Sequence, residues 1–273
     1  MKAFAHRSFA IGAVLSALLA LAAALSFAWT PYSVYDIDMA SKLQPASGAH
    51  WFGTDAYGRD VASLILVGAR ASIAVGVIAV GIGLVIGTAF GLLASAKRGW
   101  WEEIIMRVAD FGFAFPAILS AIMFTAVFGP GMVNAIVAIG IYNIPTFARI
   151  TRASANAVWS REFVMAARAC GKGAVAITMD HVLPNIASVL IVQATIRFAI
   201  AILAEAALSY LGLGTQPPQP SWGRMLSEAQ TLMFQAPMLA VYPGVAIALA
   251  VLGLNLLGDG LRDIFDPRLA RKR

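Results

Sequence analysis

The chain has 273 residues, of which 60% are hydrophobic and only 12% charged, and its formal net charge is +6. A mean hydropathy of +0.78 excludes an ordinary soluble globular protein and predicts an integral membrane protein built from helices. The single cysteine, Cys170, excludes an intramolecular disulfide, and the sequence has no Cys/His cluster typical of a structural metal. Because the basic residues lie beside apolar runs, where they act as topology signals, we expect no nucleic-acid binding.

The first apolar run covers residues 8–29 and follows the basic residues Lys2 and Arg7. A bilayer core about 30 Å thick needs about 20 helical residues, so this run is long enough to span it. A cleaved signal peptide is the alternative, but its apolar region is usually only about 7–15 residues long, and no clear cleavage site follows Leu25. We therefore expect an uncleaved first transmembrane helix.

Residues 30–68 are polar and are expected to form an outer loop. Residues 50–60 within it have the sequence HWFGTDAYGRD, which is rich in glycine and aspartate. Such a segment favours a turn-rich loop held by Asx turns.

Three further spans are predicted at residues 71–94, about 108–128 and about 132–150. In the first of them, glycines at four-residue spacing form a shallow face that favours close packing of a neighbouring helix: Gly83, Gly87 and Gly91. Pro116 is expected to kink the next span. Asn143 and Pro145 interrupt the last one, where they either satisfy a bent helix or line a pathway.

A polar and basic segment, residues 160–185, interrupts the apolar runs. It predicts a short amphipathic helix, a stop at Gly171 and Gly173, and a restart of the helix through Pro184. The expected fifth span, residues 186–213, contains Arg197 and Glu205, and charges within a span are functional candidates by default. On one helix these two lie about 80° and about 12 Å apart, so we expect no direct ion pair between them.

The remaining chain is expected to form an outer loop at residues 214–237, with a short helix over residues 224–234, and a sixth span at residues 239–257. Basic residues are concentrated in the segments that this topology places inside, and only four lie in the outer ones: Lys42, Arg59, Arg70 and Arg224. The positive-inside rule then places both termini and residues 160–185 in the cytoplasm.

Three segments together resemble a known family. Ala166, Ala167 and Gly171, followed by Leu183 and Pro184, resemble the EAA loop of ABC importer permeases. The FGTDxxGRD pattern at residues 52–60 and the block LGLGTQPPQPSWGRML at residues 211–226 resemble the dipeptide, oligopeptide and nickel group of these permeases. The chain differs from the loop pattern at Met165, where the family has glutamate, and Glu162 one turn earlier is a possible substitute.

The resemblance implies the ABC importer permease fold, in a multi-pass protein of a bacterial inner membrane. It implies residues 1–70 as an N-terminal helix with an outer loop and residues 71–273 as a permease core. Its implied partners are a second permease, expected to be a different chain, two ATP-binding subunits, an extracytoplasmic substrate-binding protein and membrane lipid. ATP and Mg²⁺ would be bound by the ATP-binding subunits and no cofactor by this chain.

The implied ATPase-docking residues lie in the EAA-like segment: Arg161, Glu162, Ala166, Ala167, Arg168, Gly171, Lys172, His181, Leu183 and Pro184. Arg161, Arg168 and Lys172 are expected to pair with acids of the ATPase. Candidate pathway or gate residues are Asn143, Arg197 and Glu205, with a bracing role favoured for Glu205.

The predicted function is a non-catalytic permease subunit that couples ATPase motion to alternating access and imports short peptides. A nickel importer of the same group and a secondary transporter or channel that works alone remain alternatives. The absence of HExxH, GxSxG, SxxK and a phosphate loop argues against a membrane protease, a serine hydrolase and a self-sufficient ATPase.

Overall fold

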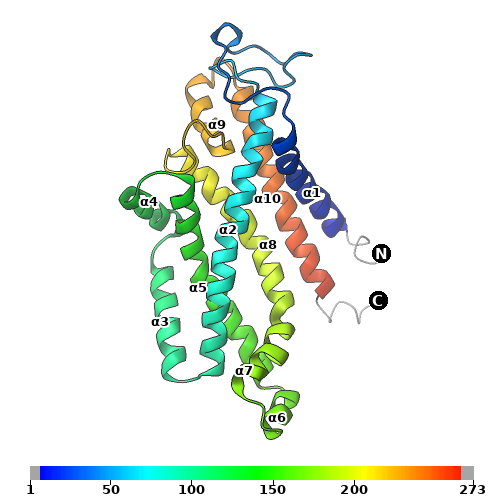
Figure 1. Ribbon diagram of the computed structural model, residues 1–273, viewed down its shortest axis with the longest axis vertical. Coiled ribbons are helices and arrows are strands. Elements are labelled where there is room, and N and C mark those ends of the chain that lie inside the picture. Colours follow the sequence, from blue (N-terminus) through cyan, green and yellow to red (C-terminus); the bar gives the residue numbers. More distant parts are fainter. Residues whose placement is uncertain (1–6, 266–273) are drawn as a thin grey trace.

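Long helices run along the longest axis of the molecule in the computed structural model, which describes residues 7–265 (Figure 1). Apart from a single bridge between Thr54 and Asp60, these residues form no β-structure. The elements are α1 (Arg7–Ala28), η2 (Met39–Ser41), α2 (Val61–Ala96), α3 (Trp100–Ala114), α4 (Ala117–Phe128), α5 (Met132–Trp159), α6 (Glu162–Ala169), α7 (Ala174–Ile177), the π-helix η3 (Thr178–Val182), α8 (Leu183–Tyr210), α9 (Trp222–Ala229), η4 (Gln230–Leu232) and α10 (Met238–Phe265).

Five of these helical segments are long and apolar enough to cross a membrane: α1, α2, α5, the continuous segment Ala174–Tyr210, and α10. Helices α3 and α4 make a sixth span when they are taken together, although the chain bends by 86° between them. This architecture confirms the predicted all-helical membrane fold.

The second span begins earlier than expected. Helix α2 starts at Val61, so the outer loop ends at Asp60 and the proposed division after residue 70 falls inside α2. Asp60 caps the helix by accepting a hydrogen bond from the Ser63 N–H at 2.8 Å. With 36 residues, α2 is about 54 Å long and extends beyond a bilayer core of about 30 Å.

The expected kink at Pro116 is a complete break. Phe115 and Pro116 adopt extended conformations, and α4 turns sharply away from the direction of α3 (Figure 1). Proline has no N–H to continue the helical hydrogen bonds and disfavours a helical conformation in the residue before it. Pro145, in contrast, lies inside an uninterrupted α5, and the expected end of that span at residue 150 is nine residues short of Trp159.

Glycines on α2 allow α5 to approach closely. A Cβ at Gly83 would lie 2.3 Å from the Asn143 Cβ, and a Cβ at Gly87 or Gly91 would lie 2.5 Å from a backbone oxygen of α5. Because Cβ atoms do not approach other atoms so closely, only glycine fits at these three positions. The predicted packing role of the glycine face is confirmed.

The fifth span is longer than predicted and is not restarted by Pro184. Helical structure continues from Ala174 through η3 to Tyr210, 37 residues in all. The π-helical turn directly before Leu183 and Pro184 widens the helix where proline leaves one hydrogen bond unmade. One rigid element therefore connects the α6 end of the molecule with its opposite end (Figure 1).

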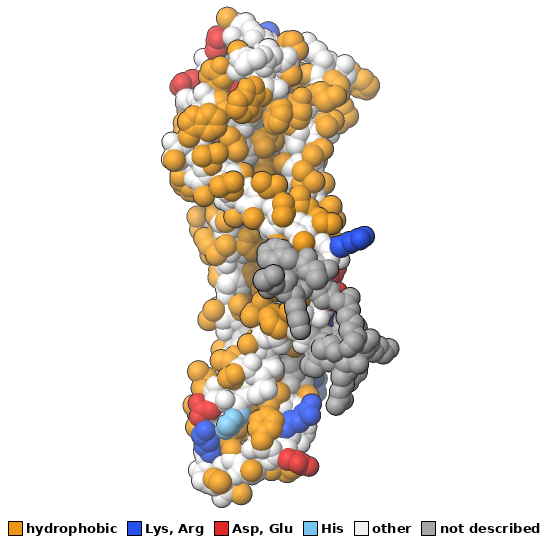
Figure 2. All heavy atoms as spheres, turned by 90° about the vertical axis from the view of Figure 1, so that its right-hand side faces the viewer, with side chains coloured by type: hydrophobic (Ala, Val, Ile, Leu, Met, Phe, Trp, Pro, Cys, Tyr) orange, Lys and Arg blue, Asp and Glu red, His pale blue; other side chains and the backbone are white. Residues whose placement is uncertain are grey.

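On the face shown in Figure 2, hydrophobic side chains cover the middle and upper parts of the molecule. Charged side chains lie at both ends of this face, and several basic side chains and a histidine gather at the lower end, where α6 lies. This distribution agrees with a membrane-spanning middle and a lower end in the cytoplasm.

Candidate functional site

Helix α6 ends in a tight reversal at Gly171. The Gly171 N–H donates to the Arg168 carbonyl at 2.9 Å, and the Lys172 N–H donates to the Ala167 carbonyl at 3.1 Å. Gly171 has a φ of +82°, and these paired bonds form a Schellman motif, which favours glycine at this position. The predicted helix and glycine stop are thus confirmed.

The reversal is anchored to the helical core by buried aliphatic side chains. Val164, Ile177 and Val182 are fully buried and belong to the same core cluster as Trp159. Other apolar side chains of this region are directed away from the core and are substantially exposed: Phe163, Met165, Val175 and Met179. A rigid element with exposed apolar side chains is a typical surface for protein association. We call these four residues the docking surface, for the role that we propose for them.

Two of the basic residues expected to bind a partner already interact within the chain. The Arg168 guanidinium lies over the Trp159 ring, 5.0 Å from its centroid, and Lys172 Nζ is 2.7 Å from Asp180 Oδ2. His181 contacts this group, since its Nε2 is 3.3 Å from Lys172 Nζ. Both side chains can still approach a second protein, but Lys172 is already ion-paired and Arg168 already has a cation–π contact.

The other predicted docking residues differ in exposure. Arg161, Glu162 and Ala166 are exposed, and neither charged side chain forms an ion pair with another described residue. Ala167 and Leu183 are half-buried against the core cluster, whereas Pro184 is exposed. The structure therefore brings the predicted residues into one region, in which Ala167 and Leu183 help to hold the element on the core.

The candidate pathway residues occupy three separate environments. Asn143 is buried and packs against Gly83 of α2, while it also lines a small pocket between α4, α5 and α8. Arg197 lies in the middle of α8, and its Nε is buried without a hydrogen-bond partner among the described residues. No ion pair joins Arg197 to Glu205, as expected.

Glu205 connects α8 to the outer loop that follows it. Its carboxylate is fully buried and accepts hydrogen bonds from the Ser209 hydroxyl at 2.6 Å and the Thr215 hydroxyl at 3.1 Å. Ser221, which caps α9, is a further polar neighbour. These contacts tie the end of α8 to the loop that positions α9.

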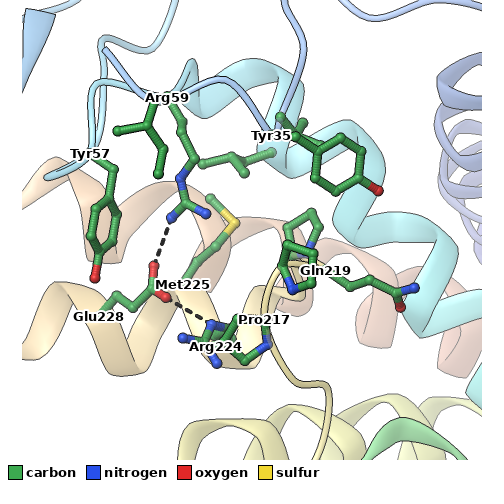
Figure 3. Close-up of a pocket in the computed structure, with 13 residues that line it drawn as sticks. Tyr35, Tyr57, Arg59, Pro217, Gln219, Arg224, Met225 and Glu228 are labelled. Atoms are coloured by element: carbon green, nitrogen blue, oxygen red, sulfur yellow. Dashed lines mark hydrogen bonds and ion pairs between the residues drawn. The ribbon is translucent and has the colours of Figure 1, made fainter. Parts of the chain in front are cut away.

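A pocket of about 250 Å³ lies at the opposite end of the molecule from α6 (Figure 3). Tyr35 and Tyr57 line it together with the proline-rich segment at residues 217–220. Beside it, the carboxylate of Glu228 bridges two guanidinium groups, accepting from Arg59 at 3.0 Å and from Arg224 at 2.8 Å.

The FGTDxxGRD segment holds this outer region together. Asp55 accepts hydrogen bonds from the N–H groups of Tyr57 and Arg59, in agreement with the expected Asx turn, and its second oxygen pairs with the Arg59 side chain. Sequence reasoning identified this segment and the proline-rich block separately but did not predict that Arg59 and Glu228 join them. The i,i+4 spacing of Arg224 and Glu228 signals only the pair that these two residues form on α9.

Comparison with known proteins agrees with this architecture. Residues 83–271 match the family described as "Binding-protein-dependent transport system inner membrane component". A methionine ABC transporter, MetNI, described as inward facing, has a chain with a TM-score of 0.63 to this one, at 18% identity, covering 74% of this chain and 97% of that chain. This likeness shows a shared fold.

Closer relatives are permeases named for glutathione transport. The glutathione transport system permease protein GsiD of Escherichia coli O6:K15:H31 is 44% identical over 98% of this chain and 89% of its own length. Its counterpart from Pectobacterium atrosepticum is 43% identical over 98% of this chain and 90% of its own. The chain therefore belongs to the binding-protein-dependent family of bacterial inner-membrane permeases, in the dipeptide, oligopeptide and nickel group of ABC importers.

Proposed function

We propose that this permease subunit imports short peptides of the glutathione type in an ATP-driven complex. The observation that carries the proposal is 44% identity to a glutathione transport permease over 98% of the chain. The proposed complex contains a second, different permease chain, two ATP-binding subunits and an extracytoplasmic binding protein. ATP and Mg²⁺ are bound by the ATP-binding subunits, and this chain is not catalytic. Residues 71–273 form its proposed permease core.

The ATP-binding subunit docks on the α6 end of the chain. On the docking surface, Met165 is 57% exposed and Val175 is 79% exposed. This surface lies at the end of the molecule where basic side chains gather. Burial of such side chains in a partner's groove is favourable by about 25 cal/mol per Å². Arg161 and Glu162 flank this surface and are free to pair with charges on the partner.

Motion of the ATP-binding subunits reaches the membrane through the continuous helix Ala174–Tyr210. Its first turns are anchored in the core by Ile177 and Val182, and its last turns are tied to the outer loop by Glu205. A rigid helix of 37 residues transmits a displacement at one end to the other. We assign Glu205 the role of a brace. Asn143 packs against α2 and borders the pathway, and Arg197 lies on the pathway.

Reconstitution tests the transport function. Liposomes with this chain and all four partner chains are expected to accumulate labelled glutathione or di- to pentapeptides only when ATP is supplied. Nickel uptake in place of peptide uptake would assign the other substrate of the group. Uptake by this chain alone without ATP would contradict the importer and identify a secondary transporter or channel.

Two variants at Gly171 test the docking site. Gly171→Leu places a β-carbon and a bulky side chain at a positive φ, so it is expected to distort the reversal and weaken co-purification of the ATP-binding subunits. Gly171→Asn is the matched control, because asparagine tolerates this conformation and no atom of the chain lies within 4 Å of the added Cβ. Equal retention of the ATP-binding subunits by Gly171→Leu and wild type would contradict this placement.

A further inference from the structure

Arg197 is a charged residue in the middle of a membrane-spanning helix and has no acidic partner among the residues that the structure describes. Its Nε is buried without a hydrogen bond, whereas its terminal nitrogens are not enclosed by the chain. An arginine in this state needs an acceptor from outside the chain.

The surroundings of Arg197 indicate where that acceptor comes from. Gln193, Arg197, Ile200 and Ala204 follow the i, i+4, i+7, i+11 spacing that places them on one face of α8. Ile200 and Ala204 line the pocket between α4, α5 and α8, together with Tyr142. Arg197 therefore lies one turn from that pocket, on the same side of the helix.

Lipid is not a suitable environment for this side chain. An arginine at the centre of a bilayer is costly, and such residues face protein or a water-filled cavity. The other sides of α8 are occupied near this depth: Phe198 packs against Gly76 of α2, and Thr195 against Gly258 of α10. The face of α8 that carries Arg197 is therefore directed toward either the transport pathway or the companion permease.

We propose that Arg197 binds a carboxylate of the peptide during its passage and so makes the pathway selective for peptides that carry a free carboxylate. A guanidinium forms two parallel hydrogen bonds with a carboxylate, and every short peptide with a free C-terminus carries one. Tyr142 and Gln193 contribute neutral polar groups beside it. This inference rests on the proposed peptide import.

The first test compares uptake by the complete reconstituted complex with Arg197→Gln, Arg197→Lys or Thr195→Val in this chain. Arg197→Gln is expected to lower the rate of peptide uptake about tenfold to a hundredfold, while binding-protein-stimulated ATP hydrolysis continues. Arg197→Lys keeps the charge and is expected to retain intermediate uptake. Thr195→Val, on the neighbouring face, is expected to transport like wild type.

The second test replaces the only native cysteine, Cys170→Ser, and introduces Arg197→Cys. Reaction with aminoethyl methanethiosulfonate restores a positive charge and is expected to recover uptake, whereas the anionic sulfonatoethyl reagent is expected to react without recovery. Bound peptide is expected to slow both reactions.

Three outcomes would overturn the proposal: wild-type uptake by Arg197→Gln, loss of the companion permease from Arg197→Gln on purification, or no protection of Arg197→Cys by peptide. The second of these would assign Arg197 to a subunit interface. Failure of the proposed function is distinguishable, because the wild-type complex would then take up no peptide with ATP.

Discussion

The two ends of the molecule differ in the number of polar contacts that their side chains form within the chain. At the outer end, residues 30–60 and α9 are joined by hydrogen bonds and ion pairs within the chain, including the bridge from Arg59 through Glu228 to Arg224. At the α6 end, the polar contacts are few, and the apolar side chains of the docking surface remain exposed. Both ends expose large apolar side chains, Tyr35 and Phe234 among them at the outer end, but the outer end is also held together by polar contacts within the chain. We propose that the α6 end completes its contacts in an assembly.

Because of this difference, we expect substitutions at one end to affect the stability of the chain and substitutions at the other end to affect binding of a partner. Substitutions at the outer end are expected to change the stability of the chain itself, because they leave buried groups without partners. Substitutions on the docking surface are expected to change binding with little effect on folding, because their side chains contact few residues of the chain. Three predictions test this division, beginning with the largest expected effect.

Asp60→Ala is expected to destabilise the chain by about 2 kcal/mol or more. The substitution removes the cap of α2 and the hydrogen bonds of the buried carboxylate to the Ser63 hydroxyl, at 2.7 Å, and to His50 Nδ1, at 3.0 Å. For a chain of this size, that loss lowers Tm by about 4–8 °C in a thermal-unfolding measurement in detergent. Asp36→Ala, at an exposed position of the same loop, is the control. Equal Tm values for both variants would contradict the expected contribution of the Asp60 contacts to the stability of the chain.

Phe163→Asp is expected to reduce retention of the ATP-binding subunits at least about tenfold, because it places a charge where the proposed partner buries an aromatic ring. Pull-down of the assembled complex measures this retention, and the Tm of the isolated chain should stay within about 1 °C of wild type. Phe234→Asp, at a fully exposed aromatic residue of the outer region, is the matched control and should retain the ATP-binding subunits. Full retention by Phe163→Asp would remove Phe163 from the docking surface.

Lys172→Ala is expected to have the smallest effect on stability. The side chains of Lys172 and Asp180 are 37% and 53% exposed, and ion pairs of this kind contribute about 0–1 kcal/mol. Thermal unfolding at low and high salt measures this contribution, which should decrease as salt increases. A loss of stability comparable to that caused by Asp60→Ala would show that the α6 end depends on its polar contacts as strongly as the outer end does.

Much of the architecture could be predicted from local sequence. Long apolar runs predicted the membrane spans, glycines at four-residue spacing predicted the α2–α5 contact, and Gly171 predicted the stop after α6. Each of these signals depends on residues close in sequence and on general preferences of the backbone. The docking, pathway and gate residues remain predictions, because they concern other molecules.

Two predicted helix boundaries differ from those in the structure. Asp60 and its polar neighbours suggested a loop, but the carboxylate caps a helix that begins at Val61. Pro184 suggested a restart, but the preceding π-helical turn accommodates it. Asp60 lies outside α2 and begins it as a cap, whereas Pro184 lies within a continuous helical segment because the turn before it is π-helical.

Hydropathy and short motifs are local properties, so the amino-acid sequence was sufficient to identify a helical membrane protein of the ABC importer permease family. Packing of the helices was needed to show that Arg168 and Lys172 already have intrachain contacts, that Arg59 joins the outer loop to Glu228 of α9, and that Arg197 forms no ion pair with a described acid. These facts depend on side chains that are far apart in the chain, and their contacts arise only when the helices pack.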